Sequence, residues 1–167
     1  KAATPAQAQR HWKALRPTKA QRPRRDLRAR AIKPLHRVRF KERHAYGAKT
    51  TGVAELARVK PALHVPKGYG VPFYYYDRFM KELGFYDAVK ALLADPKFTT
   101  DPAQRRDALK ALRADMKKAK VPKKLAADLE GMHKRFPAGR ALRCRSSANN
   151  EDLEGFSGAG LYNSYTH

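Results

Sequence analysis

The first 43 residues limit where this chain can build a core. They contain 15 Lys or Arg residues against two acids, Asp26 and Glu42, and they carry few large apolar side chains. Prolines divide the stretch at four positions: Pro5, Pro17, Pro23 and Pro34. Such a segment buries too little apolar surface to offset the entropy lost on ordering, and its prolines interrupt any long helix. We therefore expect a basic, extended arm over residues 1–43 and a folded domain over residues 44–167, and we expect the domain to stay folded without the arm.

The charge of the chain indicates an anionic partner. Lys and Arg number 37 against 15 Asp and Glu, which gives a net charge of +22. Nucleic acid, nucleotide phosphates or an acidic surface would each account for such an excess. For the arm, two interpretations stay open. It is either a solvated leader or a segment that lies on RNA phosphates. The candidate RNA contacts are Arg10, Arg16, Arg22, Arg24, Arg25, Arg28 and Arg30.

Apolar periodicity predicts a helix-rich domain after residue 44. Helices are expected over residues 73–83 and 85–93, and two more begin at Pro102 and Pro122. The core-facing stripe predicted for the first of these helices consists of Phe73, Tyr76, Met80 and Leu83. The helix that begins at Pro102 carries Arg105, Arg106, Lys110, Arg113, Lys117 and Lys118 on its polar side. That side is either an ordinary solvated face or an electrostatic docking surface.

Two segments have the composition of phosphate-binding loops. The first, Gly47-Ala48-Lys49-Thr50-Thr51-Gly52, is a tight turn into a helix, with Thr50 or Thr51 as the cap and Val53, Leu56 and Ala57 on the inner face. Lys49 would lie beside the free N–H groups at the start of the helix, so its charge and these donors would both favour a bound phosphate. The alternative is a solvent-exposed lysine in a lysine-rich protein.

The second segment is a short strand over residues 141–145 that opens into a loop rich in Ser, Asn and Gly. Such a loop leaves backbone N–H groups free and admits a ligand closely. Arg145 ends the strand, and its guanidinium offers forked donors that suit phosphate oxygens. A surface turn with an exposed arginine is the alternative. Within the strand, Cys144 is expected to be a small buried side chain.

These segments resemble a known family. Residues 47–56, the run Val65-Pro66-Lys67-Gly68-Tyr69-Gly70-Val71-Pro72, and Arg145-Ser146-Ser147-Ala148 followed by Glu151-Asp152-Leu153 occur in that family's order. The family is the ATP-binding domain of phosphoenolpyruvate synthase and pyruvate phosphate dikinase. The resemblance implies an α/β (α+β) fold, the N-terminal subdomain of an ATP-grasp-like domain, helix-rich with a small sheet and preceded by the basic arm.

The resemblance also implies a chemistry. Lys49 and Arg145 match the family's phosphate-contacting side chains, and Gly158, Ala159 and Gly160 match its Gly-rich loop over the phosphates. ATP and Mg²⁺ would be the cofactors, and the phosphoryl group would pass to a His on a separate domain and then to pyruvate. The second ATP-grasp subdomain and that His domain have no counterpart here. The expectation is therefore an incomplete phosphotransferase that is completed by the remaining domains of a longer enzyme.

Whether this chain is itself an enzyme stays open at this point. The alternative function is a non-catalytic RNA-binding structural protein, such as a ribosomal or organellar-ribosomal subunit, that reuses the subdomain. The six His residues show no metal-ligand spacing, one Cys excludes an internal disulfide, and no long apolar run predicts a membrane helix. The single Cys fits a reducing compartment such as the cytoplasm or the mitochondrion.

Overall fold

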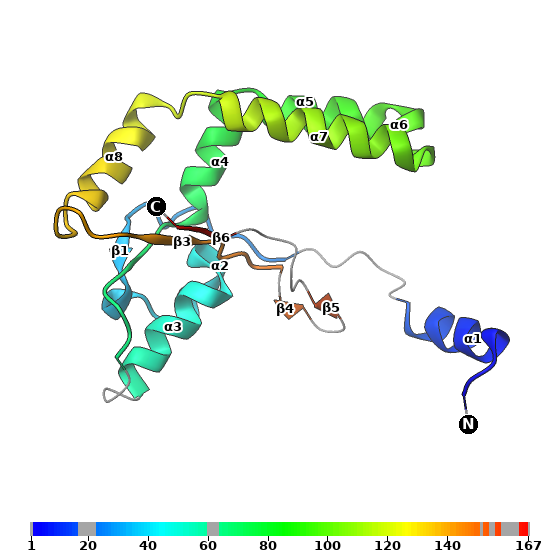
Figure 1. Cartoon of the computed structure of the whole chain (residues 1–167), viewed down its shortest axis with the longest axis horizontal. Helices are drawn as coiled ribbons and strands as arrows, with labels where there is room; N and C mark the ends of the chain where they lie inside the picture. Colours follow the sequence, from blue (N-terminus) through cyan, green and yellow to red (C-terminus); the bar gives the residue numbers. More distant parts are fainter. Residues whose placement is uncertain are drawn as a thin grey trace.

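The computed structural model describes residues 2–16, 23–59, 64–150, 152–153, 156–157 and 164–166. Figure 1 shows a helix-rich chain. Within the described residues the strands pair in three antiparallel sheets of two strands each, and the expected fold class is confirmed. The helices are α1 (Pro5–Leu15), α2 (Arg43–Tyr46), α3 (Ala48–Val59), α4 (Phe73–Glu82), α5 (Phe85–Ala94), α6 (Pro96–Thr100), α7 (Pro102–Lys118) and α8 (Lys123–His133). The strands are β1 (Lys33–Pro34), β2 (Tyr69–Gly70), β3 (Arg143–Arg145), β4 (Asp152–Leu153), β5 (Phe156–Ser157) and β6 (Ser164–Thr166).

The basic block of the sequence does not behave as one arm. Its first part forms α1, which Figure 1 shows apart from the other helices and which has no buried residue. Pro5 begins this helix instead of interrupting it, because the first helical residue needs no N–H partner. The second part, residues 23–43, packs against the domain. Two short 3₁₀ turns, Leu35–Arg37 and Phe40–Glu42, lead from β1 into α2.

The central core includes a residue of this basic block. Val38 is fully buried, and it packs with Ala45, Tyr46 and Ala54. The Tyr46 hydroxyl donates to the carbonyl of Ala31 at 2.7 Å. Burial raises the pKa of Tyr46 to about 12, so the hydroxyl stays a donor at neutral pH. The packed core therefore includes a residue that precedes residue 44.

A strand pair ties the same block to the family-like Val-Pro-x-Gly segment. β1 runs antiparallel to β2, with Lys33 opposite Gly70 and Pro34 opposite Tyr69. Gly70 is buried, and a side-chain carbon on it would lie 2.7 Å from Cγ2 of Thr50. This close approach brings β2 against α3, and it explains why the strand carries glycine there.

Four of the helices after β2, namely α4, α5, α7 and α8, begin where the sequence predicts, whereas the short helix α6 is not predicted. The side chain of Asp101 accepts the backbone N–H groups of Ala103 and Gln104, as expected for the cap of α7. Figure 1 shows α5, α6 and α7 lying along one another, with α4 descending from them toward the core. The predicted elements are confirmed, although the buried sides of two helices differ from those predicted.

In α4 the buried residues are Tyr75, Asp77 and Met80, while Tyr76 is 54% exposed. Three consecutive tyrosines leave the phase of the apolar stripe undetermined. Tyr75 is the tyrosine that is buried because of a distant partner: its hydroxyl donates to Asp128 of α8 at 3.1 Å. Burial and this bond raise the pKa of Tyr75 to about 12.

In α3 the buried residues are Thr51 and Ala54, whereas the predicted Leu56 is 47% exposed. Thr51 tolerates complete burial because its hydroxyl bonds the carbonyls of Gly47 and Ala48, each at 3.1 Å.

The strand that carries Arg145 belongs to a two-stranded ribbon. β3 pairs antiparallel with β6, and Arg143, Cys144 and Arg145 lie opposite Thr166, Tyr165 and Ser164. All three β3 side chains are exposed. Cys144 is therefore not the buried residue that the sequence predicts, because a narrow ribbon leaves its faces uncovered. Among the described residues no helix is both long and apolar enough to cross a membrane.

Candidate functional site

The two phosphate-loop segments meet in the fold. The hydroxyl of Ser147 accepts the backbone N–H of Thr50 at 3.0 Å and donates to the carbonyl of Tyr46 at 2.8 Å. The backbone N–H of Ala48 donates to the carbonyl of Ala148 at 3.1 Å. We call this contact between residues 46–50 and 147–148 the motif junction. It joins stretches of chain that lie about 100 residues apart in the sequence.

Gly47 makes the junction close. Its φ is 83° and its ψ is 160°, a backbone conformation that is essentially restricted to glycine. A side-chain carbon on Gly47 would lie 2.4 Å from both the carbonyl oxygen and the hydroxyl of Ser147. The loop therefore rests directly on the backbone of the turn, where any side chain would displace it.

The junction changes the expected role of the start of α3. The N–H groups of Ala48 and Thr50 are bonded to the loop, and the N–H of Thr51 donates to Gly47 at 3.2 Å. These donors are consequently not free for a phosphate. Neither Thr50 nor Thr51 is the cap of the helix, because Ser147 supplies that oxygen from the other segment. In a single sequence, only the position of this serine inside the second segment hints at the role.

The two candidate cations lie next to this junction. Lys49 is the second residue of α3, between the bonded residues Ala48 and Thr50, and Arg145 ends β3 two residues before Ser147. Both side chains are exposed. The other candidate phosphate ligands, Gly158, Ala159 and Gly160, lie outside the described residues, as does Glu151. The fold thus brings together the two segments that carry Lys49 and Arg145.

A sequence model of one family, described as pyruvate phosphate dikinase, AMP/ATP-binding domain, matches residues 43–167. The chain belongs to this family. The match covers both segments of the motif junction, and it confirms the resemblance that the sequence motifs indicate. No curated protein and no solved structure matches the chain.

The family match does not cover the seven arginines that are candidate RNA contacts, and several of them have partners within this chain. Arg28 makes a two-pronged pair with Asp26, with Nε and Nη2 each at 3.0 Å from a carboxylate oxygen. Hydrogen bonds from Arg28 lower the pKa of Asp26 to about 2. Arg30 stacks over the ring of Tyr74 at 5.3 Å, and Arg25 pairs with Asp77. Arg10 lies on the separate helix α1, Arg16 directly follows that helix, and Arg22 is outside the described residues.

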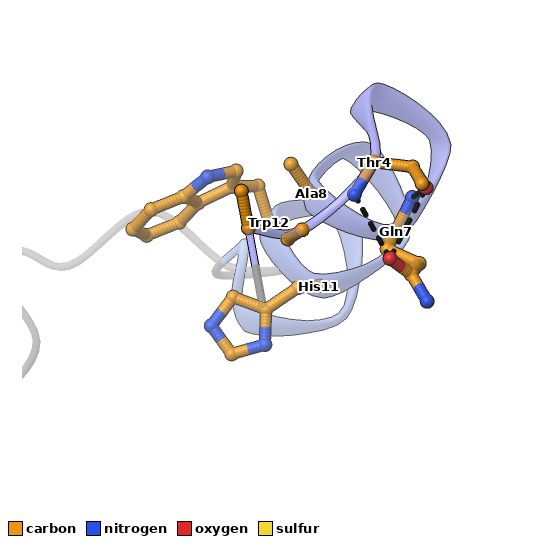
Figure 2. A pocket seen from close by; sticks show the side chains of 7 residues that line it. Thr4, Gln7, Ala8, His11 and Trp12 are labelled. Carbon is orange, nitrogen blue, oxygen red and sulfur yellow. Dashed lines mark hydrogen bonds between the residues drawn. The ribbon is translucent and has the colours of Figure 1, made fainter.

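A shallow hollow on α1 does not belong to the family's site. Figure 2 shows that it is lined by α1 and the residues just before it, including Thr4, Gln7, His11 and Trp12. The bonds drawn there form the cap of the helix: the N–H of Thr4 donates to the Gln7 side chain at 2.9 Å, and the N–H of Gln7 donates to Thr4 Oγ1 at 3.3 Å. These contacts stabilise the helix start and involve no residue of the motif junction.

Metal binding has no ligand set in the described part of the domain. No group of three or more His, Cys, Asp or Glu side chains there could hold an ion. The Mg²⁺ that the family implies is therefore assigned no protein ligand among these residues.

Proposed function

We propose that this chain binds ATP through its phosphates at the motif junction, as the nucleotide-binding part of a phosphotransferase of the phosphoenolpyruvate synthase and pyruvate phosphate dikinase type. Membership of the AMP/ATP-binding domain family supports the nucleotide. The single observation that carries the location is the bond between Ser147 and Thr50, because it holds the Lys49 segment and the Arg145 segment together.

The proposed chemistry follows from the charges beside the junction. Phosphoryl transfer involves little covalent work by the protein, so catalysis depends on positioning and on charge stabilisation. Arg145 offers forked N–H donors for two phosphate oxygens, and Lys49 offers a compact point charge. With the N–H groups of Ala48 and Thr50 already bonded to the loop, these two cations are the principal phosphate ligands in the proposal.

The alternative of an RNA-binding structural protein receives no comparable support. The family match concerns a nucleotide-binding domain, and three of the seven candidate RNA contacts, Arg25, Arg28 and Arg30, already have partners within this chain. A guanidinium that already pairs with a carboxylate has fewer N–H donors left for a phosphate.

Replacing either cation should weaken nucleotide binding while the fold is retained. Lys49→Ala and Arg145→Ala each remove a charge-assisted contact, which we expect to raise the Kd for ATP by about 10- to 100-fold. Isothermal titration calorimetry of the folded variants measures this effect. Both side chains are exposed, so the melting temperature should stay close to that of the wild type.

Matched controls separate a specific site from general charge. Lys67→Ala and Arg140→Ala each remove one exposed cation of the same type elsewhere in the domain, and they should leave the Kd unchanged. Equal weakening by all four substitutions would mean that ATP responds to the net charge alone. Unchanged affinity in Arg145→Ala would show that the proposed site is wrong.

A further inference from the structure

Arg25 is held in place by a buried carboxylate. The side chain of Asp77 in α4 is only 4% exposed, and Arg25 Nη1 lies 3.5 Å from its Oδ1. The hydroxyl of Tyr86 in α5 accepts from Arg25 at 2.9 Å and donates to Asp77 at 3.0 Å. Lys81 completes the set at 3.0 Å from Oδ2. A buried charge is costly unless it is fully paired, so this cluster fixes the chain at Arg25.

The residues on either side of Arg25 contact different elements. The carbonyl of Arg24 accepts a hydrogen bond from the side-chain amide of Asn149, and the N–H of Asp26 donates to the carbonyl of His44 in α2 at 2.7 Å. Three consecutive residues therefore contact three parts of the fold. Arg24 contacts the loop that follows β3, Arg25 contacts α4 and α5, and Asp26 contacts α2. The carbonyl of Arg24 has a defined position because the residue beside it is fixed.

Asn149 directly follows the residues of the motif junction. The loop is thus held at two points at least: Ser147 and Ala148 bond the turn and the start of α3, and Asn149 bonds Arg24. The second point lies outside the family's domain, because the family match begins at residue 43. A segment that the family description does not include contacts the loop that carries Arg145.

We propose that residues 24–26 act as a clamp that positions the loop of residues 145–150, with Arg25 as the positioning residue. The guanidinium of Arg25 does not contact Asn149 of the loop in this proposal. It fixes the backbone at residue 25, and the neighbouring carbonyl of Arg24 accepts the hydrogen bond from Asn149. The consequence for nucleotide affinity rests on the proposed function. The clamp itself is a statement about the loop and does not depend on ATP.

Amide hydrogen exchange of the full chain tests the clamp without any nucleotide. Arg25→Ala should raise the exchange rate of the amides in residues 145–150 by about fivefold, because the Arg24 carbonyl that holds Asn149 is no longer fixed. Asp77 keeps Lys81 and Tyr86, so α4 and α5 should exchange as in the wild type. Arg24→Ala is the matched control: it removes the same charge one residue away but keeps the carbonyl, and loop exchange should not change.

A second variant guards against global unfolding of Arg25→Ala. Asn149→Ala removes the donor from the loop side and should speed exchange in residues 145–150 and in residues 24–26 together. Arg25→Lys keeps the charge beside Asp77 and should recover most of the protection. Equal rates of loop exchange in Arg25→Ala and Arg24→Ala would overturn the clamp. If Arg25→Ala does not fold, wild-type exchange rates in Asn149→Ala would overturn it instead.

Titration with ATP separates this proposal from the proposed function. If the wild type binds ATP, Arg25→Ala should raise the Kd although Lys49 and Arg145 are intact, and Arg24→Ala should not. If the wild type does not bind ATP, the proposed function fails, while the exchange rates still decide whether residues 24–26 hold the loop. If ATP binds but Arg25→Ala changes neither its Kd nor the loop exchange, the clamp is refuted and the nucleotide site stands.

Discussion

Gly47→Ala is expected to lower the free energy of unfolding by at least about 3 kcal/mol, a large share of the total stability of a small domain. Two causes act together. The φ of 83° and ψ of 160° are strained for any residue with a side chain, and the new carbon would lie 2.4 Å from the backbone and hydroxyl oxygens of Ser147. Urea denaturation followed by circular dichroism measures the loss. The bond between Ser147 and Thr50 should break in whatever fraction still folds.

Two other glycines are controls that separate the causes. Gly84 has a φ of 71° but no atom within 4 Å of the added carbon, so Gly84→Ala should cost about 1–2 kcal/mol from backbone strain alone. Gly52 lies inside α3 with open space around it, so Gly52→Ala should add about 0.5–1 kcal/mol of stability. If Gly47→Ala were as mild as Gly84→Ala, the loop would not rest on Gly47.

Two N-terminal deletions should differ sharply. Removing residues 1–16 takes away α1, which has no buried residue, and the remaining chain should melt cooperatively at the wild-type temperature. Removing residues 1–43 takes away the fully buried Val38, strand β1 and Arg25, which is one of the partners of Asp77. Burial of Val38 alone is worth about 1.5–3 kcal/mol, and the buried carboxylate loses one of its cations, so we expect the cooperative transition to disappear.

Differential scanning calorimetry of the two truncated chains measures this difference. The shorter deletion is the control for loss of chain and of charge at the N-terminus. A sharp transition near the wild-type temperature after removal of residues 1–43 would show that residues 23–43 lie on the domain without contributing to its stability. It would also restore the boundary that composition alone places at residue 44.

The helices could be predicted because their signals are local. The side chain of Asp101 caps α7 within three residues, Pro102 begins that helix, and α4, α5, α7 and α8 appear where the sequence places them. Which side of a helix is buried depends on partners elsewhere. Tyr75 is buried because Asp128 of α8 accepts its hydroxyl, and nothing near Tyr75 in the sequence distinguishes it from Tyr76.

The role of the basic block could not be predicted for the same reason. Local composition describes residues 23–43 as polar and charged, but their partners lie far along the chain. Arg25 pairs with Asp77 and donates to Tyr86, and the carbonyl of Arg24 accepts from Asn149. For the candidate site, the motifs placed Lys49 and Arg145 in two segments, and the fold brings those segments together. The cap that Ser147 supplies to α3 is visible only once both segments are in place.

The central claim is that one nucleotide phosphate site lies where these two segments meet. The most direct measurement is a titration of the isotope-labelled chain with ATP, monitored by nuclear magnetic resonance. The claim predicts that the amide signals of residues 47–51 and 145–150 shift together along one saturation curve, while those of α1 and α7 stay in place. Shifts confined to one of the two segments, or shifts that appear only on the basic surfaces of α1 and α7, would contradict it.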